Sequence, residues 1–129
     1  RGGKLTMGPL WDFDLSSGNV NYGHVSPEGW ALNTASWIVM LVRDPNFTGK
    51  MKTRWNQMKA DKIFTLTAYV DQQANYLRES QKENYIKWDI LNTYINPNQV
   101  VTGSYTGEVA YFRDWMQRRI QWMDAEINK

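Results

Sequence analysis

Two aspartates, Asp12 and Asp14, are the residues whose type and spacing best suit chemistry in this sequence. They are separated by one residue and close the segment 8–14, which reads Gly-Pro-Leu-Trp-Asp-Phe-Asp. Magnesium prefers oxygen ligands, usually one or two carboxylates together with phosphate oxygens and water. The pair therefore predicts a magnesium site in which Asp12 and Asp14 are the protein's ligands. An Asp that caps a helix or closes a turn is the alternative explanation of the same pattern.

The backbone that carries the two aspartates is predicted to be extended up to Asp14. Pro9 fixes its own φ and disfavours helix at the residue before it. The alternating polar and apolar residues 4–7 predict a short strand that leads into the segment. Because side chains alternate along an extended chain, the two carboxylates should share one side. Trp11 and Phe13 should then anchor the other side against a core.

A calcium loop of the EF-hand type is a rival explanation, since Asp12, Asp14 and Ser16 would take its first, third and fifth positions. The pattern requires Gly at the sixth position and a bidentate Glu at the twelfth. The chain has Ser17 and Gly23 at those positions. This rival is therefore excluded.

Segment 8–14, followed by Gly18-Asn19, resembles the metal-binding segment of the spore coat protein H (CotH) kinase family. Residues 115–124, Trp-Met-Gln-Arg-Arg-Ile-Gln-Trp-Met-Asp, are similar to the closing helix of that family, which tends to read Trp-Leu-x-x-Arg-Ile-x-Trp-Leu-Asp. Between them, Trp37, Asp44-Pro45-Asn46-Phe47 and Arg54-Trp55 also fit. The resemblance spans nearly the whole chain and is most specific in its first fifth.

The family is an atypical, kinase-like one, so the resemblance implies ATP- and magnesium-dependent phosphoryl transfer to Ser or Thr of a protein substrate. Asp12-Phe13-Asp14 would take the place of the kinase Asp-Phe-Gly, with Asp12 as the magnesium ligand beside the nucleotide phosphates. Asp14 departs from the kinase Gly, and is either a second ligand or a structural hydrogen-bond acceptor. The resemblance alone also implies a bacterial spore coat or cell-surface location.

The chain is expected to be one domain, residues 1–129, cut from the C-terminal part of a kinase-like domain, because Arg1-Gly2-Gly3 is not a natural start. The lysine, covering loop and catalytic Asp of a kinase precede the Asp-Phe-Gly position. We therefore expect no catalytic residue in the fragment, no activity of its own and no bound magnesium or ATP. Its partner would be the missing N-terminal part of the parent domain.

A non-catalytic module for surface adhesion or carbohydrate binding, or an inactive scaffold, is the alternative function. Trp11, Trp30, Trp88 and the Asn-rich loops favour it, because sugars stack on aromatic faces. The chain contains seven Trp, more than a small core usually needs. Residues that precede Arg1 would discriminate, since a lysine and an Asp-containing catalytic loop would favour the kinase.

Composition and charge exclude several other classes. With 129 residues and 42% hydrophobic content, the chain can form one sizeable core. A net charge of +2 without a basic stripe predicts no nucleic-acid partner. No apolar run approaches the ~20 residues of a spanning helix. The absence of Cys excludes disulfides and thiolate metal sites.

The remainder is predicted to be mainly α, with about four helices forming the lower part of a kinase-like C-lobe. A polar loop should cover Leu15–Glu28. The first expected helix ends at Asp44, and the second is capped by Asp44 with Pro45 in its first turn. The third runs from about 65 to 91, with a bend suggested by Gln81 and Asn84. The last begins at Glu108.

Apolar stripes predict the buried side of each helix. In the first helix Trp37, Ile38, Leu41 and Val42 should belong to the core. The stripe of the last helix consists of Val109, Phe112, Met116, Ile120, Met123 and Ile127, widened by Trp115 and Trp122. Arg119 falls near this stripe and would need a carboxylate partner if buried.

Overall fold

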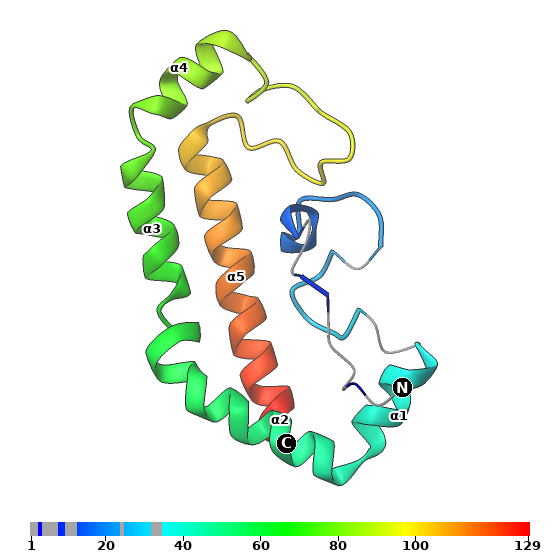
Figure 1. Ribbon diagram of the computed structural model, residues 1–129. Coiled ribbons are helices and arrows are strands. Elements are labelled where there is room, and N and C mark those ends of the chain that lie inside the picture. The colour runs from blue at the N-terminus through cyan, green and yellow to red at the C-terminus, as the bar shows by residue number, and fades with distance from the viewer. Residues whose placement is uncertain (1–2, 4–7, 10–12, 24, 32–34) are drawn as a thin grey trace.

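The computed structural model describes residues 3, 8–9, 13–23, 25–31 and 35–129, and this part of the chain is mainly helical, as predicted (Figure 1). Its elements are the 3-10 helix η1 (Asp14–Ser17), the α-helices α1 (Ser36–Arg43), α2 (Pro45–Met58), α3 (Leu66–Tyr76), α4 (Ser80–Lys87) and α5 (Tyr105–Asn128), and a π-helical turn, η2 (Lys59–Ile63), after α2. The described residues contain no strand, and the strand predicted at 4–7 lies outside them.

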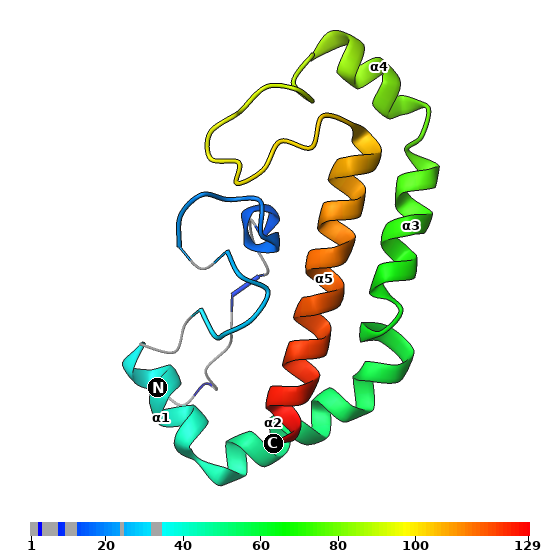
Figure 2. The same cartoon turned by 180° about the vertical axis from the view of Figure 1, so that it is seen from behind.

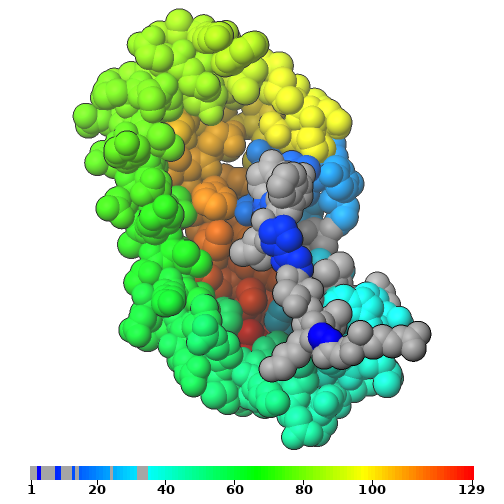
Figure 3. All heavy atoms as spheres, in the orientation of Figure 1, coloured from blue at the N-terminus to red at the C-terminus, as the bar shows by residue number. Residues whose placement is uncertain are grey.

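Helix α5 is the central element of the fold. Figures 1 and 2 show α3 running antiparallel along one side of α5 and the N-terminal segment lying along the other. In Figure 3, atoms of α5 lie at the bottom of a hollow bordered by α3. Among the described residues, Val20, Ile120 and Ile127 are buried apolar side chains, with exposed fractions of 6%, 7% and 8%. The core therefore follows α5, and no helix of the described residues is long and apolar enough to cross a membrane.

The start of α2 agrees with the sequence prediction. Asp44 precedes the helix in an extended conformation, and its Oδ1 accepts a hydrogen bond from the backbone N–H of Asn46 at 2.8 Å. Pro45 occupies the first helical position, where its missing N–H costs no hydrogen bond. Purely local chemistry fixes this boundary.

Helix α5 begins at Tyr105, three residues before the predicted start at Glu108. Ser104 is its N-cap, because the Ser104 hydroxyl accepts a hydrogen bond from the Gly107 N–H at 3.0 Å. The Glu108 carboxylate reaches back to the backbone N–H of Thr102 at 3.1 Å. The first contact satisfies an N–H group that the first turn of a helix leaves free, and the second fixes the residues just before the N-cap, so the boundary lies at Ser104.

The prediction that the apolar face of α1 belongs to the core is wrong for three of its four residues, while Ile38 is half-buried. Trp37, Leu41 and Val42 are 54%, 37% and 47% exposed, and α1 has no buried residue. The helix packs mainly against α2. Periodicity identifies an apolar face, but a face is buried only where another element covers it.

The predicted third helix is divided into α3 and α4, so the expected bend is confirmed, a few residues before Gln81. Val70 and Ala74 are half-buried toward α5. Leu77 and Trp88, assigned to the same stripe, are 44% and 58% exposed. The break ends the stretch that runs along α5 (Figure 1), although Leu91, farther along the same stripe, is half-buried beside the start of α5.

The C-terminal end of α5 is joined to α2 and η2 through Asp124. Its Oδ1 accepts hydrogen bonds from the Trp55 indole N–H at 2.7 Å and from the Lys59 ammonium at 3.0 Å. Asn128, one turn on, donates to the same atom at 2.9 Å. The bond from Trp55, then that from Lys59, lowers the pKa of Asp124 below its ordinary value. This carboxylate holds together residues about 70 positions apart.

Candidate functional site

Of the two predicted metal ligands, the structure describes only the backbone of Asp14. Asp12 is outside the described residues, and Asp14 is the first residue of η1, with its side chain outside the description. The residue between them, Phe13, has φ −90° and ψ 5°. Extended backbone therefore does not continue to Asp14, and that part of the prediction is wrong.

A tight turn replaces the extended backbone at this point. The backbone N–H and the hydroxyl of Ser16 both donate to the Phe13 carbonyl, at 3.1 and 2.5 Å. The side chain of Phe13 is 59% exposed, so the prediction that it anchors against a core is also wrong. Local hydrogen bonds of Ser to the backbone compete with extended structure, and here they determine the conformation.

The far end of η1 is fixed on α5. Gly18 caps η1 with φ 89°, and a Cβ added there would lie 2.2 Å from Cδ1 of Trp115. The Gly18 carbonyl accepts a hydrogen bond from the Tyr111 hydroxyl at 2.9 Å. One turn farther along α5, the Trp115 indole N–H donates to the Val25 carbonyl at 2.8 Å. The backbone of the N-terminal segment therefore lies directly on the helix.

Asn19 joins the same segment to the loop before α5. Its Oδ1 accepts two hydrogen bonds, from the backbone N–H groups of Gln99 at 2.9 Å and Val100 at 3.2 Å. The N–H of Asn21 donates to the Pro97 carbonyl at 2.7 Å. Gly18 and Asn19, which follow the two aspartates in the sequence, thus fix the backbone of the N-terminal segment against α5 and the loop before it.

Arg119 holds the end of the N-terminal segment through backbone carbonyls. Its guanidinium donates to the carbonyls of Pro27 at 3.0 Å and Gly29 at 2.6 Å. It also lies 5.0 Å from the ring of Trp122 and 5.7 Å from that of Trp30. Burial lowers the pKa of Arg119. Among the described residues no carboxylate pairs with Arg119, which is only half-buried; two carbonyl oxygens and two aromatic rings lie close to the charge instead.

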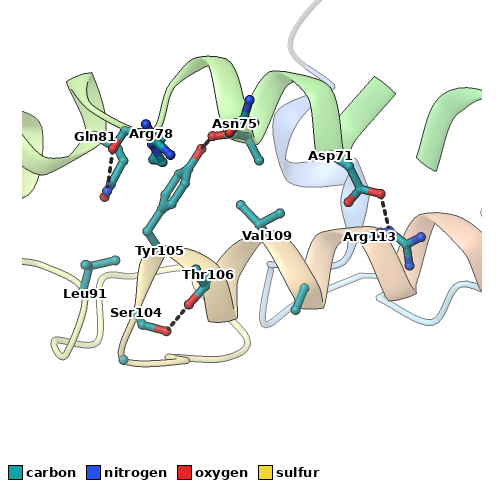
Figure 4. Close-up of a pocket in the computed structure, with 13 residues that line it drawn as sticks. Asp71, Asn75, Arg78, Gln81, Leu91, Ser104, Tyr105, Thr106, Val109 and Arg113 are labelled. Carbon is teal, nitrogen blue, oxygen red and sulfur yellow. Dashed lines mark hydrogen bonds and ion pairs between the residues drawn. The ribbon is translucent and has the colours of Figure 1, made fainter. Parts of the chain in front are cut away.

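A groove of about 600 Å³ lies apart from this segment, between α3 and the start of α5 (Figure 4). The Tyr105 side chain spans this groove, and its hydroxyl donates a hydrogen bond to the Ala74 carbonyl at 3.0 Å. Asp71 is the only carboxylate among its described lining residues, and it is paired with Arg113 at 3.0 Å. No group of three or more His, Cys, Asp or Glu among the described residues could hold a metal ion. The Asp12–Asp14 pair thus remains the candidate site.

The Trp residues that favoured sugar binding lie in different surroundings. Trp30 makes an edge contact with Trp122, with ring centroids 4.8 Å apart. Trp88 is 58% exposed, with the Lys87 ammonium 5.5 Å from its ring. Trp11 is outside the described residues. The face of Trp30 is thus partly used in contacts within the protein.

Sequence reasoning did not predict the role of three residues that fix the N-terminal segment, although two of them belong to the recognised motifs: Asn19, Tyr111 and Trp115. The Trp residues of the last helix were interpreted as packing, yet the indole N–H of Trp115 also carries a specific hydrogen bond. A signal was present, since residues 111, 115 and 119 recur every four positions and each ends in a donor. Such spacing places them on one helix face.

A family model described as CotH kinase protein matches residues 1–123. The match covers nearly the whole chain, including both the Asp12–Asp14 segment and most of α5. No curated protein and no solved structure matches the chain.

Proposed function

The chain belongs to the CotH kinase family, and we propose that it is the metal-binding, C-terminal part of an atypical protein kinase. In the intact protein the reaction would be ATP- and magnesium-dependent phosphoryl transfer to Ser or Thr of a protein substrate. The observation that carries this proposal is the family match over residues 1–123, which includes Asp12-Phe13-Asp14.

The donor set fits the proposed ion. Two carboxylates separated by one residue offer the hard oxygen ligands that magnesium accepts, and leave room for phosphate oxygens and water. Asp12 is proposed as the ligand and Asp14 as a second ligand or a structural acceptor. A bound magnesium ion would neutralise negative charge on the nucleotide phosphates during transfer.

Phosphoryl transfer requires further groups that we assign to parts of the whole protein outside residues 1–129. In protein kinases these are a lysine on the phosphates, a covering loop and an Asp that orients the acceptor hydroxyl, and all precede the Asp-Phe-Gly position. The 129-residue chain alone is therefore proposed to be inactive. Its N-terminal partner region would complete the nucleotide site.

The test compares three Asp→Asn variants of the intact protein: Asp12→Asn, Asp14→Asn and, as a control, Asp61→Asn. Asp61 is exposed on η2. Transfer of radiolabelled phosphate from ATP to a protein substrate should disappear in Asp12→Asn and persist in the control. A ligand role for Asp14 predicts loss of activity with an unchanged melting temperature.

The melting temperature of Asp12→Asn should also stay near that of the wild type, because a carboxylate placed for a cation contributes little to packing. A capping or turn role predicts the reverse, retained transfer with about 1 kcal/mol lost stability. An active Asp12→Asn protein would end the kinase assignment of this motif.

A further inference from the structure

One face of α5 carries three donors that hold the backbone of the N-terminal segment. Tyr111, Trp115 and Arg119 are spaced by four residues and lie on the same side of the helix. Each side chain donates to a carbonyl about 90 residues earlier in the sequence, and these carbonyls are at positions 18, 25, 27 and 29. The segment after the Asp motif is therefore held in place by a helix from the other end of the chain.

The contact between α5 and the N-terminal segment ends at Arg119. The guanidinium of Arg119 is fixed by two carbonyl oxygens and lies close to two indole rings. A planar, fork-shaped donor held in this way loses little additional freedom for each hydrogen bond that it makes. Arg119 and Trp115 thus set the register of the segment along α5, independently of any ligand.

The same contact begins at Tyr111, which is close in the chain of contacts to Asp14, one of the two proposed metal ligands. The Tyr111 hydroxyl binds the carbonyl of Gly18, which caps η1, and η1 begins with Asp14. Within η1 the two hydrogen bonds from Ser16 to the Phe13 carbonyl keep the turn tight. A displacement of Gly18 is therefore transmitted through one short turn to Asp14 and Phe13.

We propose that Tyr111 is a positioning residue for the Asp12–Asp14 segment, acting through the carbonyl of Gly18. This inference deepens the proposed function and rests on it, because the segment is the proposed metal site. Tyr111 does not touch the ion or the nucleotide in this scheme. It fixes the turn that begins at Asp14, so that the backbone at this end of the segment does not have to be organised when the ion binds.

The chain offers a matched control for this role. Tyr105 lies on the same helix and its hydroxyl donates to a backbone carbonyl at 3.0 Å, but that carbonyl belongs to Ala74 of α3. Tyr111→Phe and Tyr105→Phe remove the same atom from half-buried side chains and one comparable hydrogen bond each. Only Tyr111→Phe releases the turn that carries Asp14.

The experiment measures binding of Mn²⁺, as a magnetic substitute for magnesium, to the intact protein in the presence of ATP. Free Mn²⁺ is counted by electron paramagnetic resonance, and amide hydrogen exchange of the peptide spanning 13–23 is followed without metal. Tyr111→Phe should weaken Mn²⁺ binding about threefold to tenfold and speed exchange in that peptide. Tyr105→Phe should change neither quantity, while melting temperatures of the two variants should be similar.

The two proposals fail in different ways. Wild-type protein that binds no Mn²⁺ with ATP overturns the proposed function, and Tyr111 then has no metal site to position. Wild-type protein that binds Mn²⁺, with both Tyr→Phe variants equal in Mn²⁺ affinity, overturns only the role of Tyr111. Unchanged exchange in peptide 13–23 of Tyr111→Phe would also overturn that role, because the turn would then not depend on the hydroxyl.

Discussion

Gly18→Ala is the substitution whose cost is best defined by this structure. Gly18 has φ 89°, a left-handed conformation that residues with a Cβ rarely adopt. The added Cβ would also lie 2.2, 2.3 and 2.9 Å from Cδ1, Nε1 and Cε2 of Trp115. These atoms belong to a half-buried ring whose N–H is already bonded to Val25, so the ring cannot move without losing that bond.

The expected loss has two parts. The left-handed conformation costs an Ala roughly 1–2 kcal/mol. Forcing a methyl group into a packed contact costs a further 1–3 kcal/mol or so. Gly18→Ala should therefore reduce the free energy of unfolding by about 2–5 kcal/mol. Gly23→Ala isolates the first part, because Gly23 has φ 67° and nothing lies within 4 Å of its added Cβ.

The assay is equilibrium unfolding in urea, followed by tryptophan fluorescence, for wild type and both variants. Gly18→Ala should lose more free energy of unfolding than Gly23→Ala by about 1–3 kcal/mol, the cost of the clash. In a Trp115→Ala background, the cost of Gly18→Ala should fall toward that of Gly23→Ala, because the ring that the added Cβ meets is then absent. Equal losses for the two Gly→Ala variants would refute the packing of Gly18 on Trp115.

Other substitutions test the remaining contacts of α5 and the N-terminal segment. Asp124→Asn should cost about 1–2 kcal/mol at pH 7, because it removes the charge bonded to Lys59. Since the folded-state pKa of Asp124 is lowered, that contribution is present above the unfolded pKa of ~4 and is lost as the pH falls through the folded pKa. The difference in free energy of unfolding between wild type and variant should therefore shrink as the pH is lowered below ~4. Asn19→Ala should cost about 1–3 kcal/mol in the same assay by leaving two N–H groups without their acceptor, and a loss near zero would show that water replaces it. Ile120→Ala should reduce the free energy of unfolding by about 2–5 kcal/mol, because Ile120 is only 7% exposed. Ile86 is 77% exposed, so Ile86→Ala should reduce it by less than about 0.5 kcal/mol. Similar melting temperatures for the two variants would contradict the placement of the core along α5.

Much of the helical framework could be predicted because its signals are local. The Asp44-Pro45 pair sets the start of α2 through one side chain and one fixed dihedral angle. The apolar stripe of the last helix predicted its buried face, and two of its members, Ile120 and Ile127, are buried in the core. The start of α5 was missed because Ser104 becomes a cap only when its hydroxyl reaches Gly107, and Ser is equally common in loops.

The candidate site was only partly predictable. Its residue types and spacing at Asp12 and Asp14 are visible in the sequence, and so is the family resemblance. The expected extended backbone was wrong at Phe13, where the hydrogen bonds from Ser16 close a turn. Several conformations of such a short segment are close in energy, and the contacts of Gly18 with α5 select among them.

The sequence by itself determined the helical class, the boundaries that depend on adjacent residues and the pair of carboxylates proposed to bind magnesium. Only the tertiary structure decided that α1 stays exposed, that Arg119 binds backbone carbonyls and that Tyr111 reaches Gly18. The physical reason is the range of the interactions. Caps and periodicity act over a few residues, whereas burial and the choice of a hydrogen-bond partner depend on segments that folding brings together from about 90 positions away.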